Sequence, residues 1–513
     1  MRRALLVFAA TFLIVAAVYG RVPISFLRAE SGWFLYLSHS DEATQRAMIR
    51  GFFTHSSAGH YTPLAFLAEF TTAKIVGTSR TFWKWRQLFA VSVAAAALFV
   101  AVVAIARALA LSTTQQIAVA VLLTVAIIFQ PSMIDFVNCP FMVMQLGWVA
   151  LSGVALFCLA KIFLVPSESR WTWLAAGAAY GSLHISGLGL ITVAATVAAL
   201  LWLGFRRHDR VQHQALRACA VMFVFTLVHA AMMLQPFAGS SPNRSSVSFI
   251  SNLEYTLGFI FNFFVSAVVA FAFTSPHVPD AYAMAYCWPL GLALLLFGGV
   301  GLVRYLKRVR IQSTPRRELA AMLLLFSAGG FAATMTLIAG RAFIIPDAFV
   351  VLPWFLVVPR YTVPLQFLYI GPVILLLAWA ARRRARFVVI ACWILAPILI
   401  ATQLSYQKNA LFFLVPGTRV SHYTCWRLLM AATRECRAAG VPLPNFSMAP
   451  LTREFSEADV ESFLPLLRHD LRLPPNEKIE LAPLEDYRKS GPERYQPAPS
   501  VKAFELKLEL ARD

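Results

Sequence analysis

The sequence predicts an all-α, polytopic membrane protein with about 11 transmembrane helices. Of its 513 residues, 59% are hydrophobic and only 14% are charged, and the mean hydropathy is +0.66. A soluble domain averages about 45–50% apolar and about 25% charged residues. Apolar runs long enough to span a bilayer recur along the first four-fifths of the chain. A soluble core would not contain so many runs of this length.

Positive charge lies between the apolar runs and indicates how the chain is oriented. The net charge is +20. Much of it falls in short clusters at Arg206–Arg210, Arg304–Arg317 and Arg382–Arg386. Clusters in short loops between crossings follow the positive-inside pattern of membrane proteins. We therefore expect no nucleic-acid partner.

Eleven apolar runs are predicted to cross the membrane, and most are close to the length of about 20 residues that a crossing requires. The stretch 171–205 is too long for one helix, and His184, Ser186 and Gly187 mark a turn between two short ones. The predicted crossings are 4–20, 88–106, 114–130, 141–163, 171–184, 187–205, 217–235, 284–303, 318–340, 366–381 and 387–404. The first run follows Arg2 and Arg3 and lacks a clear small-x-small cleavage pattern, so we interpret it as an uncleaved helix.

A twelfth apolar run, 256–274, is ambiguous. Whether it crosses the membrane decides on which side every later loop lies. With the N-terminus in the cytoplasm, a crossing here would place the basic clusters at 304–317 and 382–386 outside, against the positive-inside pattern. We therefore expect this run to be re-entrant, interfacial or packed within the bundle. The outside loops are then 21–87, 131–140, 236–283 and 341–365, and the tail from about 405 is outside as well.

The composition changes at the tail, which divides the chain into a transmembrane domain at 1–404 and an extramembrane region at 405–513. The tail is rich in proline and charge. Residues 421–439 have a helical pattern, and the period-two alternation from Phe504 to Leu510 favours a strand. The cysteines form no disulfide framework, because Cys425 and Cys436 share one helical stretch and would be too far apart. No cysteine spacing typical of zinc sites occurs.

The first outside loop carries the most informative polar residues. Asp41 and Glu42 open what the pattern predicts to be an amphipathic helix. Ser38-x-x-Asp41 matches a capping box, so Asp41 either caps this helix or serves as a catalytic carboxylate. In the second outside loop, Asp135 is the only carboxylate between Glu69 and Glu168. It either caps the next helix or has a functional role.

Basic residues near the crossings have two possible roles, phosphate binding or contact with lipid headgroups. Arg341 and Arg360 lie in the fourth outside loop, where an arginine holds a phosphate or extends to lipid headgroups. The same two roles are possible for three basic residues that flank the second crossing, Arg80, Lys84 and Arg86. Trp83 and Trp85 beside them are typical of interfacial anchors. His184 and His229 lie in apolar runs, and we expect each to be a buried, hydrogen-bonded histidine rather than a ligand. The sequence has no Walker loop, dinucleotide fingerprint or nucleophile elbow, which argues against a soluble nucleotide donor.

The order of these features resembles the GT-C superfamily of integral-membrane glycosyltransferases. The Asp41–Glu42 pair early in a long first loop resembles the acidic motif of protein mannosyltransferases and of lipid A aminoarabinose transferases. The run His60-Tyr61-Thr62-Pro63-Leu64 is similar to a Tyr-Arg-Pro-Leu segment of a related membrane branch, with Thr62 in place of the arginine.

The rest of the chain continues the resemblance up to about residue 404. A second outside loop carries Pro131 and Asp135, Arg360 and Tyr361 precede a late crossing, and an outside tail follows. The resemblance implies transfer of a sugar from a polyprenyl-phosphate donor to an acceptor on the outer face, where the acceptor is a glycan, a lipid or a protein. The polyprenyl donor and membrane lipid are then the expected partners.

The resemblance also implies residue roles. Asp41 would be the general base, and Glu42 or Asp135 would orient the acceptor or an ion. Arg360 would hold the lipid phosphate, and the other residues assigned to substrate binding are His60, Tyr61, Arg341 and Tyr361. Some relatives bind a divalent metal between first-loop and second-loop acids, so Asp41 and Asp135 are the candidate ligands for Mg²⁺ or Mn²⁺.

Two other functions remain open at this point. One is a transporter or flippase for lipid-linked substrates, which would place acids and prolines within helices and form an inverted repeat. The other is a non-catalytic relative or assembly protein with the same architecture. For each of them we expect a multi-pass protein of the bacterial inner membrane, with the N-terminus in the cytoplasm and the C-terminal region in the periplasm or outside the cell.

Overall fold

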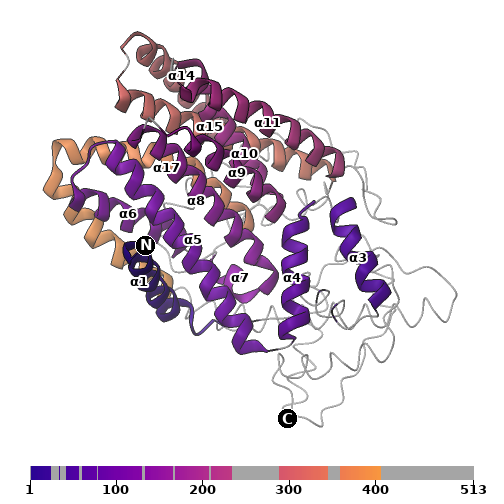
Figure 1. Cartoon of the computed structure of the whole chain (residues 1–513). Coiled ribbons are helices and arrows are strands. Elements are labelled where there is room, and N and C mark those ends of the chain that lie inside the picture. Colours follow the sequence, from indigo (N-terminus) through magenta and orange to yellow (C-terminus); the bar gives the residue numbers. More distant parts are fainter. Residues whose placement is uncertain are drawn as a thin grey trace.

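The computed structural model describes residues 2–22, 24, 34, 38, 42–56, 61–77, 79–129, 133–165, 168–206, 210–233, 288–312, 314–344 and 359–405. Within these ranges the regular structure is helical, with no β-sheet (Figure 1). The tail beyond 405 and the apolar run 256–274 lie outside the described residues, so the helix and strand predicted for the tail remain predictions.

Each predicted crossing falls on a helix. The helices are α1 (Arg2–Tyr19), α5 (Arg80–Ala108), α6 (Thr113–Ile128), α8 (Val143–Leu164), α9 (Arg170–Ile185), α10 (Gly189–Arg206), α11 (Arg210–Met233), α14 (Trp288–Ile311), α15 (Pro315–Ile344), α17 (Pro359–Arg383) and a helix at Ala385–Ser405. The break predicted near His184 and Ser186 is confirmed, because α9 ends and α10 begins there.

The chain is a membrane protein. In the part of the chain that the structure describes, five helices are long and apolar enough to cross a membrane. They are Thr81–Ala108, Pro140–Leu164, Gly189–Arg206, Val211–Met233 and Ala385–Ser405. Leu5–Tyr19 and Thr113–Ile128 are shorter apolar helices. The total of about 11 crossings stays a prediction.

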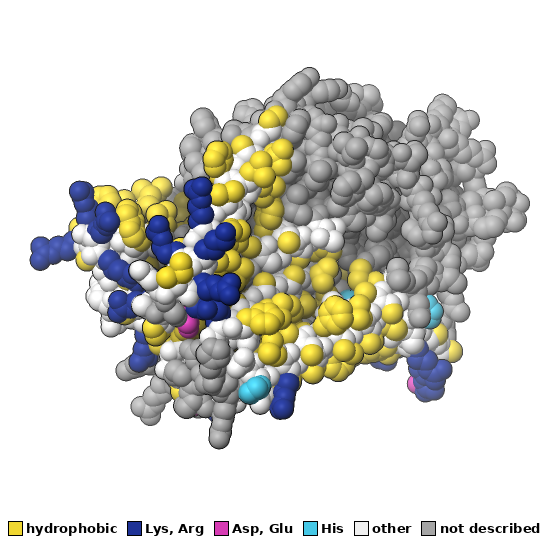
Figure 2. Space-filling view, turned by 90° about the horizontal axis from the view of Figure 1, so that it is seen from above, with side chains coloured by type: hydrophobic (Ala, Val, Ile, Leu, Met, Phe, Trp, Pro, Cys, Tyr) yellow, Lys and Arg dark blue, Asp and Glu magenta, His cyan; other side chains and the backbone are white. Residues whose placement is uncertain are grey.

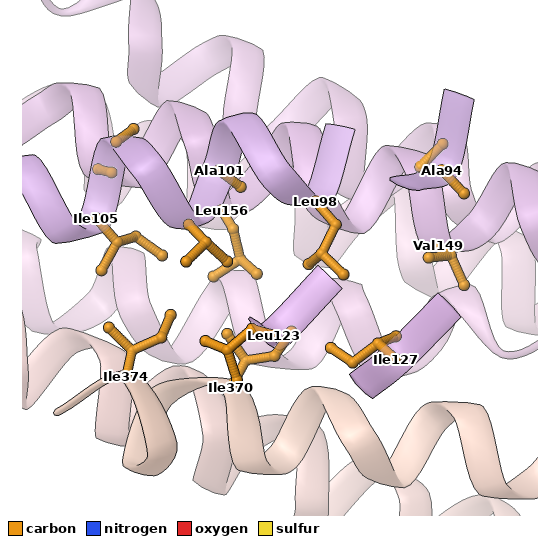
Figure 3. Packing of buried hydrophobic residues seen from close by; sticks show 14 of the residues in the cluster. Ala94, Leu98, Ala101, Ile105, Leu123, Ile127, Val149, Leu156, Ile370 and Ile374 are labelled. Carbon is orange, nitrogen blue, oxygen red and sulfur yellow. The ribbon is translucent and has the colours of Figure 1, made fainter. Parts of the chain in front are cut away.

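The centre of the bundle is the contact between α5 and α8, which run in the same direction. Ala94, Leu98 and Ile105 of α5 are fully buried in one apolar cluster with Val149 and Leu156 of α8 (Figure 3). Gly153 lets the two helices approach closely, because a Cβ atom there would lie 3.0 Å from the carbonyl carbon of Ala97. In a membrane, the hydrophobic effect does not drive helices together. Small residues at their contacts allow the close van der Waals packing that holds them instead.

The second half of the bundle packs around α15, which lies between α10 and α17. Gly371 of α17 makes the second contact possible, since a Cβ atom there would lie 2.5 Å from Ser327 Oγ and 2.6 Å from the carbonyl oxygen of Leu323. Arg317 near the start of α15 and Arg382 near the end of α17 both lie close enough to Tyr305 to act on it electrostatically, so these two helices are antiparallel. Their other ends, the end of α15 and the start of α17, therefore lie at the same end of the bundle.

The two ends of the bundle differ in charge. At what we call the basic end, Arg206 at the end of α10 donates to the carbonyl of Val309 in α14 (3.4 Å), and Arg382 at the end of α17 donates to the carbonyl of Leu109 after α5 (3.0 Å). Figure 2 shows Lys and Arg side chains gathered on this side of the molecule. The basic clusters thus share one end, as the positive-inside pattern requires.

The opposite end, the distal end, contains short helices that the sequence interpretation placed in loops. The predicted first outside loop, 21–87, holds α3 (Glu42–Thr54), α4 (Pro63–Val76) and the first turns of α5, which begins at Arg80 and not at 88. The second loop holds α7 (Met133–Asn138) and the 3₁₀ turn η1 (Pro140–Met142). The fourth loop is shorter than 341–365, because α15 continues to Ile344 and α17 begins at Pro359. The polar and charged residues in these segments made them resemble loops between crossings.

Candidate functional site at the distal end

Helix α3 begins at one of the predicted catalytic residues. Glu42 is its first residue, is largely exposed and forms an ion pair with Arg46 one turn later (2.6 Å). The amphipathic helix predicted after Asp41 is therefore confirmed, and an acid at its start is favourable for the helix dipole. Asp41 and His60 lie outside the described residues, so their roles stay predictions.

Hydrogen bonds tie α3 and the segment after it to the bundle. Lys74 of α4 donates to the side-chain oxygen of Gln45 (2.9 Å). Ser56 donates to the carbonyl of Met233 at the end of α11 (2.9 Å), and Tyr61 donates to the carbonyl of Phe53 (2.9 Å). These contacts place the first-loop helices at the distal end, where Figure 1 shows α3 and α4 beside the main bundle.

A cluster of phenylalanines packs within the same region. Phe34 and Phe141 lie with ring centroids 5.5 Å apart, and Phe34 also contacts Phe52 and Phe66. Phe34 and Phe52 are almost completely buried. Because Phe141 belongs to η1, this cluster joins the first outside loop to the second.

A buried ion pair connects α4 to the start of α5. Glu69 accepts two hydrogen bonds from the guanidinium of Arg86, and the exposed fractions of their side chains are 2% and 15%. The guanidinium lies over the ring of Trp83, 4.7 Å from its centroid. Burial raises the pKa of Glu69 and the adjacent Arg86 offsets part of this rise. The sequence interpretation had placed Arg86 at lipid headgroups or on a phosphate, and this pairing accounts for it instead.

The residue after this pair positions α7, the helix that carries Asp135. Gln87 is fully buried and donates to the carbonyls of Phe136 (2.7 Å) and Cys139 (3.0 Å). Asp135 therefore lies on a short helix fixed against the start of α5. The structure describes the backbone of Asp135 and not its side chain, so whether it meets the first-loop acids stays open to experiment.

The predicted phosphate-binding residues lie at the distal end by their position in the helices. Arg341 is in the last turn of α15, and Arg360 and Tyr361 are in the first turn of α17. These two helix ends lie together, as described above, away from the basic clusters. Only the backbone is described at these three positions.

Two histidines and two tyrosines meet where the first-loop segment contacts α9 and α11. The rings of His184 and His229 have centroids 5.2 Å apart, and Tyr61 lies 5.0 Å from His229. Tyr180 contacts His184 at 4.6 Å. Tyr61 is 8% exposed, and burial raises its pKa, so its hydroxyl stays protonated and acts as a donor. The sequence placed Tyr61 among substrate-binding residues but gave no sign that it meets the two histidines.

Polar atoms in this cluster are left without partners. His229 is 3% exposed, and neither ring nitrogen has a hydrogen-bond partner within the described ranges. The predicted burial of His229 is confirmed, and the hydrogen bond predicted for it is not found among the described residues. Thr62, next to Tyr61, is fully buried and its hydroxyl is also unpaired there. Buried polar groups are normally paired, so unpaired ones are a mark of a site.

The described residues do not form a metal site by themselves. Among them, no three His, Cys, Asp or Glu side chains lie close enough together to hold a metal ion. The candidate pair of Asp41 and Asp135 is not covered by this finding, because the first residue and the second side chain are not described. A requirement for Mg²⁺ or Mn²⁺ is thus still a prediction.

Sequence comparison adds no relative to this description. No protein-family model matches the chain, and no curated protein is significantly similar to it.

Proposed function

We propose that this chain is a membrane glycosyltransferase that moves a sugar from a polyprenyl-phosphate donor to an acceptor at the distal end of the bundle. One observation supports this above the others: helix contacts bring the start of α3, the helix of Asp135 and the helix ends of Arg341 and Arg360 to one end, opposite the basic clusters. Single-site transfer needs a base and a phosphate-binding cation on the same side of the membrane.

In this proposal the residues divide the chemistry between them. Asp41 takes the proton from the acceptor hydroxyl, and Glu42 or Asp135 orients the acceptor or a divalent ion. Arg360 stabilises the charge on the departing polyprenyl phosphate, supported by Arg341 and Tyr361. The donor enters from the lipid, which agrees with the lack of a nucleotide-binding motif in the sequence.

The direct test is sugar transfer by the purified full-length chain in lipid nanodiscs, with radiolabelled polyprenyl-phosphate sugars as donors. Asp41→Asn should abolish transfer and leave thermal unfolding unchanged. Glu168→Gln is the matched control, since Glu168 lies between α8 and α9 at the basic end and pairs with Arg170 there. Full activity of the Asp41→Asn protein would remove Asp41 as the base.

The side of the membrane is tested by labelling. Single cysteines at positions 41, 135 and 360 are introduced after the native cysteines have been replaced, and intact cells or spheroplasts are treated with a membrane-impermeant maleimide. All three should label from outside, and a cysteine at position 384 at the basic end should not. Labelling of positions 41 and 360 from opposite sides would exclude the single-site mechanism and favour the transporter.

A further inference from the structure

Helix α4 begins with an uncapped N-terminus beside the histidine pair. Thr62 is its N-cap residue, yet its side chain makes no capping hydrogen bond, and Pro63 follows at the first helical position. The next backbone N–H groups, of Leu64 and Ala65, have no carbonyl within the helix to bond to. The N-terminus of a helix with free N–H groups and an aligned dipole attracts anions, phosphate above all.

A second observation, independent of the helix N-terminus, concerns His229, whose ring contacts Tyr61. His229 is nine-tenths buried with both ring nitrogens unpaired in the described part of the chain, and its ring packs against Tyr61 (5.0 Å) and His184 (5.2 Å). The side chain of Thr62, the neighbour of Tyr61, is buried and unpaired as well. An unpaired buried imidazole or hydroxyl costs about 1–3 kcal/mol, so two of them beside one helix start are better explained by a ligand that pairs with both.

We propose that Thr62, His184, His229 and the N-terminus of α4 form a binding site for a phosphate ester. A phosphate offers several strong acceptor oxygens, which match what the site provides: a hydroxyl, backbone N–H groups and imidazole N–H groups. Among the described residues, the titratable groups whose rings contact His229 are Tyr61 and His184, and Tyr180 contacts His184 in turn. A neutral imidazole keeps one ring N–H, so each histidine can donate one hydrogen bond to an anion.

The identity of the ester as a polyprenyl phosphate rests on the proposed function, whereas the phosphate chemistry does not. His184 lies in the last turn of α9, and His229 lies one turn before the end of α11 at Met233. A phosphate at the headgroup of a lipid could meet both there while its chain stays among the helices. The site would then hold the phosphate of the donor or of the released carrier lipid.

The test is binding to the full-length chain in nanodiscs, measured with three probes: a polyprenyl phosphate, inorganic phosphate and the uncharged polyprenol. His229→Phe keeps the ring and removes both nitrogens, and Thr62→Val keeps the shape and removes the hydroxyl. Each should weaken binding of the phosphate-bearing probe by about 10-fold or more. Each should leave the melting temperature unchanged or raise it, because an unpaired polar group has been removed. His213→Phe, an exposed histidine on the same helix, is the matched control.

The outcomes separate this inference from the proposed function. Binding of polyprenyl phosphate that both variants weaken supports the two together. Binding of inorganic phosphate alone, lost in His229→Phe, supports the site but contradicts the lipid donor. Equal binding by the wild type and by both variants, or a lower melting temperature with unchanged binding, would show that the histidines only pack the fold. No binding of either phosphate by the wild type would also overturn the inference.

Discussion

The basic end and the distal end of the bundle contain ends of the same helices but are held together by different contacts. At the basic end, the half-buried Arg206 and the exposed Arg382 donate to helix-end carbonyls, and helix α6 is capped by its own Ser112 and Gln115. At the distal end, Glu69, Gln87, Thr62 and His229 are buried polar groups, and only some of them are paired.

This difference indicates that the two ends depend on side-chain geometry to different degrees. Charges of one sign facing water orient the chain and need little precise geometry. A buried ion pair contributes little net stability, whereas losing one partner is expensive, so such pairs persist where a specific arrangement matters. The distal end is thus the part whose geometry is under constraint, and four substitutions test that reading.

The largest effect is expected at the ion pair of α4 and α5. Arg86→Met leaves Glu69 buried without its partner and should lower the free energy of unfolding by about 3–5 kcal/mol. The measurement is unfolding of the detergent-solubilised protein followed by circular dichroism. Arg46→Ala, which breaks the exposed pair with Glu42, should change the same quantity by less than about 1 kcal/mol.

The pH dependence of this substitution has a definite sign. Burial already raises the pKa of Glu69, with Arg86 opposing the rise. Without Arg86 the pKa rises further above its unfolded value, so the protonated, neutral acid is the form that folds well. The defect of Arg86→Met should therefore be smallest in acid and grow as the pH rises. A defect independent of pH would mean that lost packing on Trp83, and not the unpaired charge, is its cause.

A smaller effect is expected inside the bundle, away from both ends. The indole N–H of Trp148 donates to Thr192 Oγ1 (2.9 Å), and Ser152 shares that hydroxyl (2.5 Å). Thr192→Val removes the shared oxygen and should lower the free energy of unfolding by about 1–3 kcal/mol. Thr226→Val is the control, since Thr226 bonds only to the carbonyl of Met222 in its own helix. Equal effects of the two would show that the Trp148 contact is not special.

The close contact of α5 and α8 gives a test of packing alone. Gly153→Ala adds a methyl group 3.0 Å from the backbone of Ala97 and should destabilise the protein by about 1–3 kcal/mol. Gly177→Ala meets nothing within 4 Å and should be neutral or stabilising, because alanine favours the helix. If the two substitutions behave alike, α5 and α8 are not as close at Gly153 as the 3.0 Å contact indicates.

The smallest effect is expected at the basic end. Ser112 and Gln115 form a capping box at the start of α6, and Ser112→Ala should cost about 1 kcal/mol. Ligand binding and transfer at the distal end should not change. An effect on transfer as large as that of a distal substitution would remove the distinction between the two ends.

The sequence predicted the helices of the bundle well because each is an apolar run, and its basic clusters fix which loops share a side. The start of α5 was missed because Arg80, Lys84 and Arg86 resemble residues at a membrane surface, and only the fold shows that Glu69 neutralises Arg86. Helix α4 was missed for another reason: its apolar run is short, and the count of crossings assigns it to a loop. For the site, Tyr61 was chosen by resemblance, whereas its contact with His184 and His229 depends on helices over 100 residues away and leaves no local signal.

The hairpin of α4 and α5 has a consequence for how the protein is made. Glu69 and Arg86 are only 17 residues apart, the turn between their helices is closed by Gly77 in a left-handed conformation (φ +56°), and Trp83 donates to the carbonyl of Gly77 (2.7 Å). All of these contacts lie within one short stretch of the chain. The two charges can therefore neutralise one another during insertion, before α7 has been synthesised, and the translocation machinery receives a compact pair instead of an acid and a base one after the other.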